Sequence, residues 1–250
     1  MPPTRRRHSP LIAKLTARSI DRTGPSQAAI LDELRRCLLD GEVAPGTSIP
    51  VDEVASVFGV SRIPVRESLK TLIGEGLVEH RPNLGYTVAR LTERELQEMY
   101  LVREVLESAA LTGAVHAATP ADDAEARAAH RALGAAMLAH DLRGYHRDSR
   151  RFHWALVRPC GMRRLLGMLE SAWNVTEPLQ AMTHVGDDER ARLHTDHDEM
   201  LAAFLARDTA ALLRVSRKHH HRLRATLHAL PRHTGLFADP ELPPEDICSR

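Results

Sequence analysis

The sequence predicts a mainly α-helical protein with two domains, and two observations lead to this prediction. The chain of 250 residues has room for two hydrophobic cores of ordinary size. Up to about residue 91, short helical patterns are followed by two strand patterns, whereas beyond it almost every segment repeats its apolar residues with helical spacing. We therefore expect a small N-terminal domain that ends in a β-hairpin, and a C-terminal all-α antiparallel helical bundle.

The composition excludes several classes of protein. Hydrophobic residues make up 43% and charged residues 27% of the chain, and no apolar run approaches the roughly 18 residues of a membrane span. The three cysteines lie far apart, which indicates neither a disulfide framework nor a zinc–thiolate site. We expect a cytoplasmic protein without membrane contact. The net charge of +1 is too small to indicate a partner by itself.

We expect both ends of the chain to be flexible tails. Residues 1–25 include the basic run Arg5–Arg7 but no continuous apolar segment of the kind found in signal peptides. Residues 231–250 contain four prolines, which disfavours regular structure. The two domains are then expected at residues 26–91 and 92–230.

Three short helices are predicted in the first domain. Residues 28–39 have apolar residues at helical spacing, and residues 51–58 carry a second apolar stripe that ends before a glycine. Ser61 is suited to cap a third helix, in which Pro64 lies in the first turn where its missing N–H is harmless. This third helix is expected to end at Gly74.

A β-hairpin is predicted after the third helix. Residues 77–80 and 86–89 are strand candidates, and a polar turn with proline and glycine, residues 81–85, joins them. The order of helix, helix, recognition helix and wing is that of a winged helix-turn-helix, in which the third helix can enter the DNA major groove.

The second domain is predicted to begin with a long helix. Thr92 and Glu95 form a capping box for a helix that runs to about His116. Thr119 and Pro120 are suited to start the next helix. Further helices are expected at roughly residues 141–157, 162–183, 187–206 and 209–229.

The sequence motifs of the first domain closely resemble those of the GntR superfamily of bacterial repressors over residues 27–91. The resemblance implies a bacterial transcription factor that binds an operator in double-stranded DNA. It is carried by Glu42-x-x-Pro45-Gly46-Thr47-x-Ile49-Pro50, Val54-Ala55-x-x-Phe58-Gly59-Val60-Ser61-Arg62-x-Pro64-Val65-Arg66-Glu67-Ser68-Leu69, Glu75-Gly76-Leu77-Val78 and Arg81-Pro82-Asn83-x-Gly85.

The start of the third helix carries the side chains that we expect to contact DNA. Ser61, Arg62 and Arg66 would place a hydroxyl, backbone N–H groups and two guanidinium groups where phosphates and a guanine edge lie. The resemblance implies that these residues are DNA contacts, together with Asn83 and Gly85 in the wing.

Other interpretations of the charged residues in this domain remain open. The two arginines of the third helix can instead form a solvated face or salt bridges to Glu53 or Glu67. Arg35 on the first helix can contact backbone phosphate or be mere surface charge. Arg5–Arg7 can reach a minor groove as an arm, although a disordered tail is the favoured interpretation.

After residue 91 the chain resembles the helical FCD effector domain of the FadR-like branch of that superfamily. The resemblance implies a metal ion held inside the bundle by one carboxylate-type residue and three histidines, and a small organic acid bound beside it. It is carried by Tyr100-x-x-Arg103-x-x-Leu106-Glu107, Phe152-His153-x-x-Leu156, His197-x-x-Met200-x-x-Ala203-x-x-x-Arg207-Asp208 and His219.

Three of the implied metal ligands are His153, His197 and His219, each on a different predicted helix. The family places Asp or Asn four residues before the first histidine, where this chain has Ser149. Asp148 is the nearest carboxylate, but it lies about 140° away around the helix. The fourth ligand is therefore Asp148, Ser149 or water. Zinc is the leading metal, with nickel, cobalt or manganese as alternatives.

Arg103 is the candidate for binding the carboxylate of the effector, because a guanidinium can hold both carboxylate oxygens. The alternative is an i,i+4 ion pair with Glu107. Trp154 and Trp173 are interpreted as core residues.

These features predict a homodimeric, ligand-responsive transcriptional regulator, with a repressor favoured over an activator, and no enzyme activity. Two alternatives remain open. Three histidines around an open metal position also suit a metal-dependent hydrolase, although no general base or nucleophile motif accompanies them. The third hypothesis is a DNA-binding dimer that a metal stabilises and that binds no effector.

Overall fold

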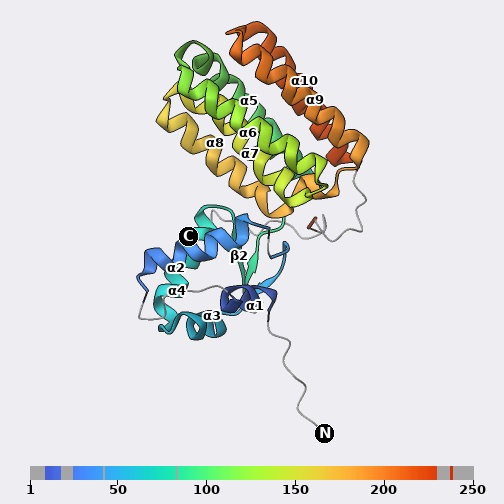
Figure 1. The fold of residues 1–250 in the computed structure, drawn as a ribbon. Coiled ribbons are helices and arrows are strands. Elements are labelled where there is room, and N and C mark those ends of the chain that lie inside the picture. Colours follow the sequence, from blue (N-terminus) through green and yellow to red (C-terminus); the bar gives the residue numbers. More distant parts are fainter. Residues whose placement is uncertain (1–8, 18–24, 42, 83, 230–236, 239–250) are drawn as a thin grey trace. The chain divides into compact units, whose positions relative to one another are not determined.

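The computed structural model describes residues 9–17, 25–41, 43–82, 84–229 and 237–238 (Figure 1). The chain divides into two compact units. Residues up to Thr92 and the short turn Glu177–Leu179 belong to the first unit, and the second begins at Glu93. Each unit is described by itself.

Among the described residues, the first unit contains four α-helices. They are α1 (Pro10–Ala17), α2 (Gln27–Leu39), α3 (Val51–Phe58) and α4 (Arg62–Gly74). The three helices predicted from sequence are thus confirmed. The side chain of Ser26 caps α2 by accepting the backbone N–H of Ala29, and α3 ends at Gly59, whose φ of 67° suits glycine.

Helix α1 corrects the prediction of a flexible tail over residues 1–25. Leu11, Ile12 and Leu15 form one apolar face of α1, and all three are buried in the hydrophobic core of the first unit. These apolar residues have helical spacing, so one face of the segment can be buried. This burial stabilises α1. Residues 1–8 and 18–24, with the predicted basic arm Arg5–Arg7, lie outside the described residues, as do 231–236 and 239–250.

A three-stranded antiparallel sheet completes the first unit. Its strands are β1 (Ser48–Ile49), β2 (Val78–Arg81) and β3 (Gly85–Val88), in the order β1-β3-β2. The predicted hairpin is confirmed, with Val78 opposite Val88 and Arg81 opposite Gly85. The short strand β1, which the sequence analysis did not predict, pairs with β3.

The second unit is a bundle of six long helices among the described residues. They are α5 (Glu93–Ala117), α6 (Pro120–Leu138), α7 (Leu142–Val157), α8 (Arg163–Thr176), α9 (Asp187–Leu205) and α10 (Thr209–His228). The short 3₁₀ helices are η1 (Arg158–Cys160), η2 (Glu177–Leu179) and η3 (Ala181–His184), of which η2 belongs to the first unit.

The helix predicted over residues 162–183 is shorter in the structure. It ends at Thr176, and Pro178 lies in the 3₁₀ turn that follows. Proline lacks a backbone N–H and disfavours helical geometry in the residue before it, which explains the early end. The predicted start of α6 is confirmed, because Thr119 and Asp122 form a capping box with Pro120 in the first turn.

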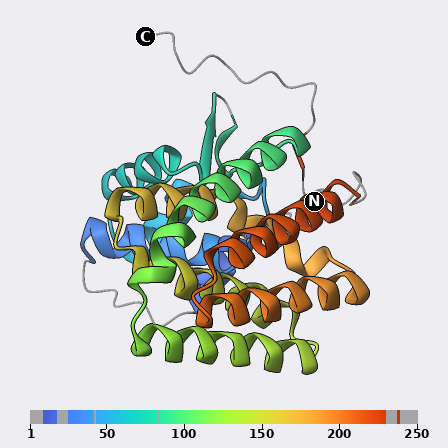
Figure 2. The same cartoon turned by 90° about the horizontal axis from the view of Figure 1, so that it is seen from above.

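Packing within the bundle is pairwise. Helix α6 packs on α7, α9 on α10, and α5 on both α8 and α10. Figure 2 shows α9 and α10 side by side as neighbouring orange and red helices. None of the helices among the described residues is both long and apolar enough to cross a membrane.

The burial of α1 leads to a stability prediction. We expect Leu15→Ala to lower the free energy of unfolding of the first unit by about 2–5 kcal/mol, because it leaves a cavity in the core. Urea unfolding followed by circular dichroism measures the change. The control is Ala13→Ser on the exposed side of the same helix, expected within about 0.5 kcal/mol of the parent. Equal stability of both variants would contradict a packed α1.

Candidate DNA-binding surface and buried histidine cluster

The N-terminus of α4 presents exposed polar groups. Ser61 is the N-cap residue of α4, but its side chain makes no capping hydrogen bond. Arg62 and Arg66 are exposed, and Arg62 forms an ion pair with Asp52, itself exposed. Such exposed pairs contribute little, at most about 1 kcal/mol, so an anion can displace Asp52. A backbone N-terminus, a hydroxyl and two guanidinium groups therefore face solvent together.

The wing residues are only partly described. Gly85 begins β3 with a φ of 80°, a backbone conformation that favours glycine, and open space lies where a side chain would be. Asn83 lies outside the described residues.

Arg35 forms ion pairs within the first unit, and its phosphate contact stays a prediction. Its Nε lies 2.9 Å and its Nη2 2.7 Å from the two carboxylate oxygens of Glu75, the C-cap residue of α4. Its Nη1 also donates to Asp32 at 2.7 Å. The hydrogen bond to Glu75 raises the pKa of Arg35, although partial burial opposes this. Arg35 thus fastens α2 to the end of α4.

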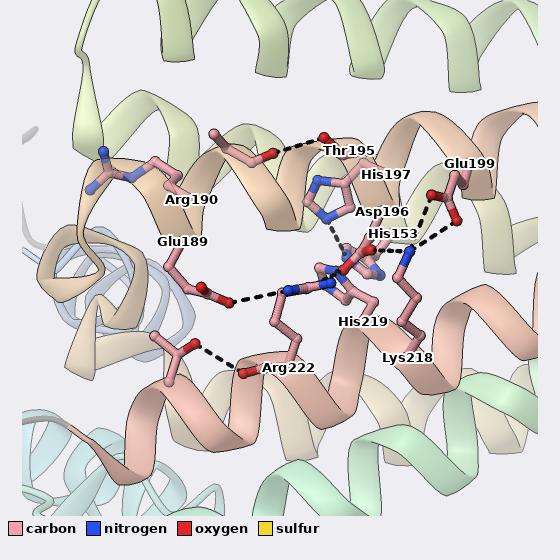
Figure 3. A network of polar contacts seen from close by, with 12 residues as sticks. His153, Glu189, Arg190, Thr195, Asp196, His197, Glu199, Lys218, His219 and Arg222 are labelled. Atoms are coloured by element: carbon pink, nitrogen blue, oxygen red, sulfur yellow. Dashed lines mark hydrogen bonds and ion pairs between the residues drawn. The ribbon is translucent and has the colours of Figure 1, made fainter.

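Three buried histidines meet inside the second unit (Figure 3). His153 comes from α7, His197 from α9 and His219 from α10, and one ring nitrogen of each lies within 4.8 Å of the others. The Nε2 atoms of His153 and His197 are 3.2 Å apart. Two imidazole nitrogens on one tetrahedral zinc ion are separated by about 3.3 Å, given Zn–N bonds of about 2.0–2.1 Å. The cluster therefore fits a metal ion, and the predicted trio is brought together.

Two buried carboxylates flank the cluster. Glu107 on α5 contacts Nδ1 of His153 with one oxygen, and its other oxygen lies 3.2 Å from Nε2 of His220. Asp196 Oδ2 lies 3.8 Å from Nδ1 of His219. The Glu107 contact on Nδ1 of His153 fixes this ring and leaves its Nε2 for a metal, as in carboxylate–histidine–metal triads, whereas Asp196 is too far from His219 for a hydrogen bond.

The protonation states also suit metal binding. Burial lowers the pKa of His197 and of His219 well below the ordinary value, and neighbouring imidazoles lower both further. Burial alone would raise the pKa of Glu107, but His153 and His220 together hold it well below the usual range. His197 and His219 are thus held in the neutral form that binds metals, and the carboxylate of Glu107 is ionised.

A polar network connects the cluster to the surface (Figure 3). Asp196 is buried, and its two oxygens each lie 2.9 Å from a cation, Nζ of Lys218 and Nε of Arg222. Lys218 also contacts Glu199 at 3.1 Å, and Arg222 lies 3.6 Å from Glu189. These pairs offset the cost of burying the Asp196 carboxylate.

Asp148 does not join the histidines. Its carboxylate pairs with Arg147 at 3.1 Å, and it is not among the side chains whose ligand atoms lie within 4.8 Å of one another. The reason is its angular position on α7, five residues before His153. Ser149 instead lines a cavity of about 30 Å³ with His153 and His219. This volume holds a water molecule.

Arg103 faces the same cavity and does not pair with Glu107. Its guanidinium lies 3.7 Å from the ring centroid of Trp173, and Nη1 donates to Oγ1 of Thr176 at 3.2 Å. Its Nε has no hydrogen-bond partner among the residues that the structure describes. Trp173 is buried, as predicted for a core residue, and it also supports this guanidinium by a cation–π contact.

Two family models match the chain. The model of the gntR family of bacterial regulatory proteins matches residues 26–88, and that of the FCD domain matches residues 98–222, half of the chain. The chain belongs to the gntR family. Its second unit carries an FCD domain, so this gntR-family protein has the two domains that the sequence motifs implied.

Named relatives agree with this membership. Escherichia coli McbR is 28% identical over 175 residues, covering 70% of this chain and 79% of McbR. The E. coli repressor GlaR is 28% identical over 196 residues, covering 74% and 88%. Other matches are shorter: the one to Bacillus subtilis YdhC, 30% identical, covers only 41% of YdhC. These relatives are named as transcriptional regulators, which favours the regulator over the metal-dependent hydrolase.

Solved structures share the fold. The structure of E. coli McbR/YncC has a TM-score of 0.72 at 25% identity and covers 81% of this chain and 96% of that one. A gntR regulator from Rhodococcus sp. RHA1 has a TM-score of 0.73 at 24% identity, covering 82% and 99%. The mainly helical fold with a small antiparallel sheet is thus confirmed.

Sequence reasoning missed the two carboxylates that flank the histidines. Glu107 appeared only as a partner of Arg103, and Asp196, which directly precedes His197, received no role. His220 also carried no predicted ligand role, and it is buried against Glu107. One signal was available, because adjacent histidines at 219 and 220 on a core helix need a buried polar partner.

Proposed function

We propose that this gntR-family protein is a ligand-responsive transcriptional repressor that binds operator DNA through α4 and binds a small carboxylic acid beside a metal ion. The observation that carries the proposal is the histidine cluster of the FCD domain, in a chain that also has an exposed recognition helix. A repressor acts on chromosomal DNA, so the expected cytoplasmic location is part of the proposal. The relatives GlaR and the gluconate operon repressors are named as repressors, which favours repression.

DNA binding is assigned to the start of α4. Ser61 and the backbone N–H groups there suit a phosphate, and Arg62 and Arg66, four residues apart, lie on one face of the helix. One guanidinium can bind O6 and N7 of a guanine while the other contacts phosphate. Gly85, with Asn83, supports a wing contact that needs a small residue.

Metal binding is assigned to His153, His197 and His219, with Ser149 or a water molecule as the fourth ligand. Zinc suits three neutral imidazoles with an open position, and nickel, cobalt and manganese are alternatives. A bound divalent ion would supply positive charge and an open coordination position for a carboxylate oxygen. Glu107 orients the ring of His153 for this purpose.

Effector binding is assigned to Arg103. Its guanidinium is held against Trp173 and has a free Nε in the cavity beside His153, so it can donate two hydrogen bonds to a carboxylate. The cavity of about 30 Å³ is too small for an organic acid, so side chains must move for it to enter. This small volume also favours a second candidate function, a metal-stabilised DNA-binding dimer without an effector.

Homodimerisation is assigned to the outer face of α5. This face exposes Leu101, Val102 and Val105. The neighbouring helix α8 adds Met168, and Met162 is exposed directly before its first residue. An exposed apolar patch of this kind marks an interface. Two copies joined in this way would present two recognition helices to paired half-sites.

The first prediction concerns DNA. We expect Arg62→Ala and Arg66→Ala each to weaken operator binding by about 1–3 kcal/mol, because each removes a guanidinium contact. The operator is first selected from random DNA with the wild type, and affinity is measured by fluorescence anisotropy at fixed salt. Lys70→Ala, further along the exposed side of α4, is the control and should retain most of the affinity. If both arginine variants bind the operator with wild-type affinity, the assignment of DNA binding to these arginines is wrong.

The second prediction separates effector from metal. We expect Arg103→Ala to lose at least about tenfold in affinity for a carboxylate, because a charged hydrogen bond contributes about 1.5–3 kcal/mol, while its metal content is unchanged. Calorimetry with acetate, citrate and other small acids, alongside elemental analysis, measures both. His197→Ala should lose both the metal and the acid. If no acid binds the metal-loaded wild type, the effector-free dimer is the better description.

The third prediction concerns the dimer. We expect Val105→Glu to convert the protein to a monomer, because a buried unpaired carboxylate opposes association. Light scattering after size-exclusion chromatography at micromolar concentration measures the mass. Leu138→Glu, on the exposed side of α6, is the matched control and should remain dimeric. A monomeric wild type, or a dimeric Val105→Glu, would rule out this interface.

A further inference from the structure

A second group of metal-binding side chains lies between α6 and α9. His130 belongs to α6, and His194 and Asp198 belong to α9, where their spacing of four residues places them on one face. One ligand atom of each residue lies within 4.8 Å of the others. None of the three belongs to the cluster of His153, His197 and His219.

The ring nitrogens of this group are available to a cation. Nε2 of His130 lies 2.9 Å from Oδ1 of Asp198, yet neither this nitrogen nor Nδ1 of His194 has a hydrogen-bond partner among the described residues. Both nitrogens are buried from solvent. The two rings are nearly parallel, at 18°, with centroids 5.2 Å apart. Buried nitrogens without partners are costly, and a shared cation would satisfy both.

We propose that His130, His194 and Asp198 form a second divalent metal site, with zinc as the ion that two imidazoles and one carboxylate suit. Small side-chain movements bring the three ligand atoms to coordination distance. Water completes the coordination, because the Asp198 side chain is 56% exposed and the site opens to solvent. This site is separate from the metal of the proposed function.

The two sites are neighbours that share no ligand residue. The ring of Phe152 lies 5.5 Å from the ring of His130 and 5.2 Å from that of His197, and the rings of His194 and His197 are 6.2 Å apart, measured between centroids. Because each group has its own three ligands, we infer two mononuclear sites. Helix α9 supplies ligands to both.

The consequence is that two metal ions would hold α9 from two sides. The buried cluster joins α9 to α7 and α10, whereas the second site joins α9 to α6. The second site has one charged ligand, three protein ligands in all and access to solvent. We therefore expect its zinc to bind more weakly and exchange faster than zinc at the fully buried histidines.

The test is zinc stoichiometry. Chelator-stripped protein is titrated with zinc chloride by calorimetry, and bound zinc is measured after equilibrium dialysis. We expect two zinc ions per chain for wild type and one for His130→Ala, with Asp198→Asn weakening the second ion by at least about tenfold. His197→Ala should keep the second ion and lose the first. His221→Ala, which changes an exposed histidine outside both clusters, should keep two.

The outcomes are decisive in both directions. One zinc ion per chain in wild type that His130→Ala retains, or two in His130→Ala, would overturn the second site and identify His130 and Asp198 as an ordinary ion pair. Should His197→Ala fail to fold, the comparison of wild type with His130→Ala still decides, because both retain the buried cluster. One zinc ion in wild type that His130→Ala loses would contradict the proposed function and leave the second site standing.

Discussion

A carboxylate without solvent exposure, Glu107, determines much of the arrangement of the bundle. An isolated buried charge costs several kcal/mol, so the fold must bring it partners. These partners are His153 from α7 and His220 from α10. The need to pair the carboxylate therefore holds α5, α7 and α10 together at this level of the bundle. The same carboxylate orients the imidazole of His153, one member of the histidine cluster. Glu107 therefore helps to position the cluster although it is not a member of it.

Asp196 lies on the other side of the cluster and is connected to the surface. It lies 3.8 Å from His219 and is held by Lys218 and Arg222, which reach outward to Glu199 and Glu189. Glu107, by contrast, pairs with two buried histidines. The outer ion pairs on the Asp196 side can therefore exchange with solvent at modest cost.

The sequence predicted the features that depend on local spacing and motifs. It did not predict contacts between residues that are far apart in the chain. The three histidines were found because each lies in its own helical motif, and the poor angular position of Asp148 followed from helix geometry alone. The pairing of Arg35 with Glu75 was not predicted because Glu75 lies 40 residues away. Periodicity cannot reveal a partner on another element. Helix α1 was missed for a different reason, since its apolar spacing was visible but the basic residues before it were given more weight.

The charges around the cluster also bear on how an anionic effector would bind. Two cationic residues, Arg103 and Arg150, line the cavity, whereas the Glu107 carboxylate lies behind His153. The two guanidinium groups can attract an added carboxylate, although burying its charge is costly. A divalent ion at the histidines would add to this positive charge. On the proposed assignment, metal and acid must bind cooperatively, and each raises the affinity for the other by the same factor.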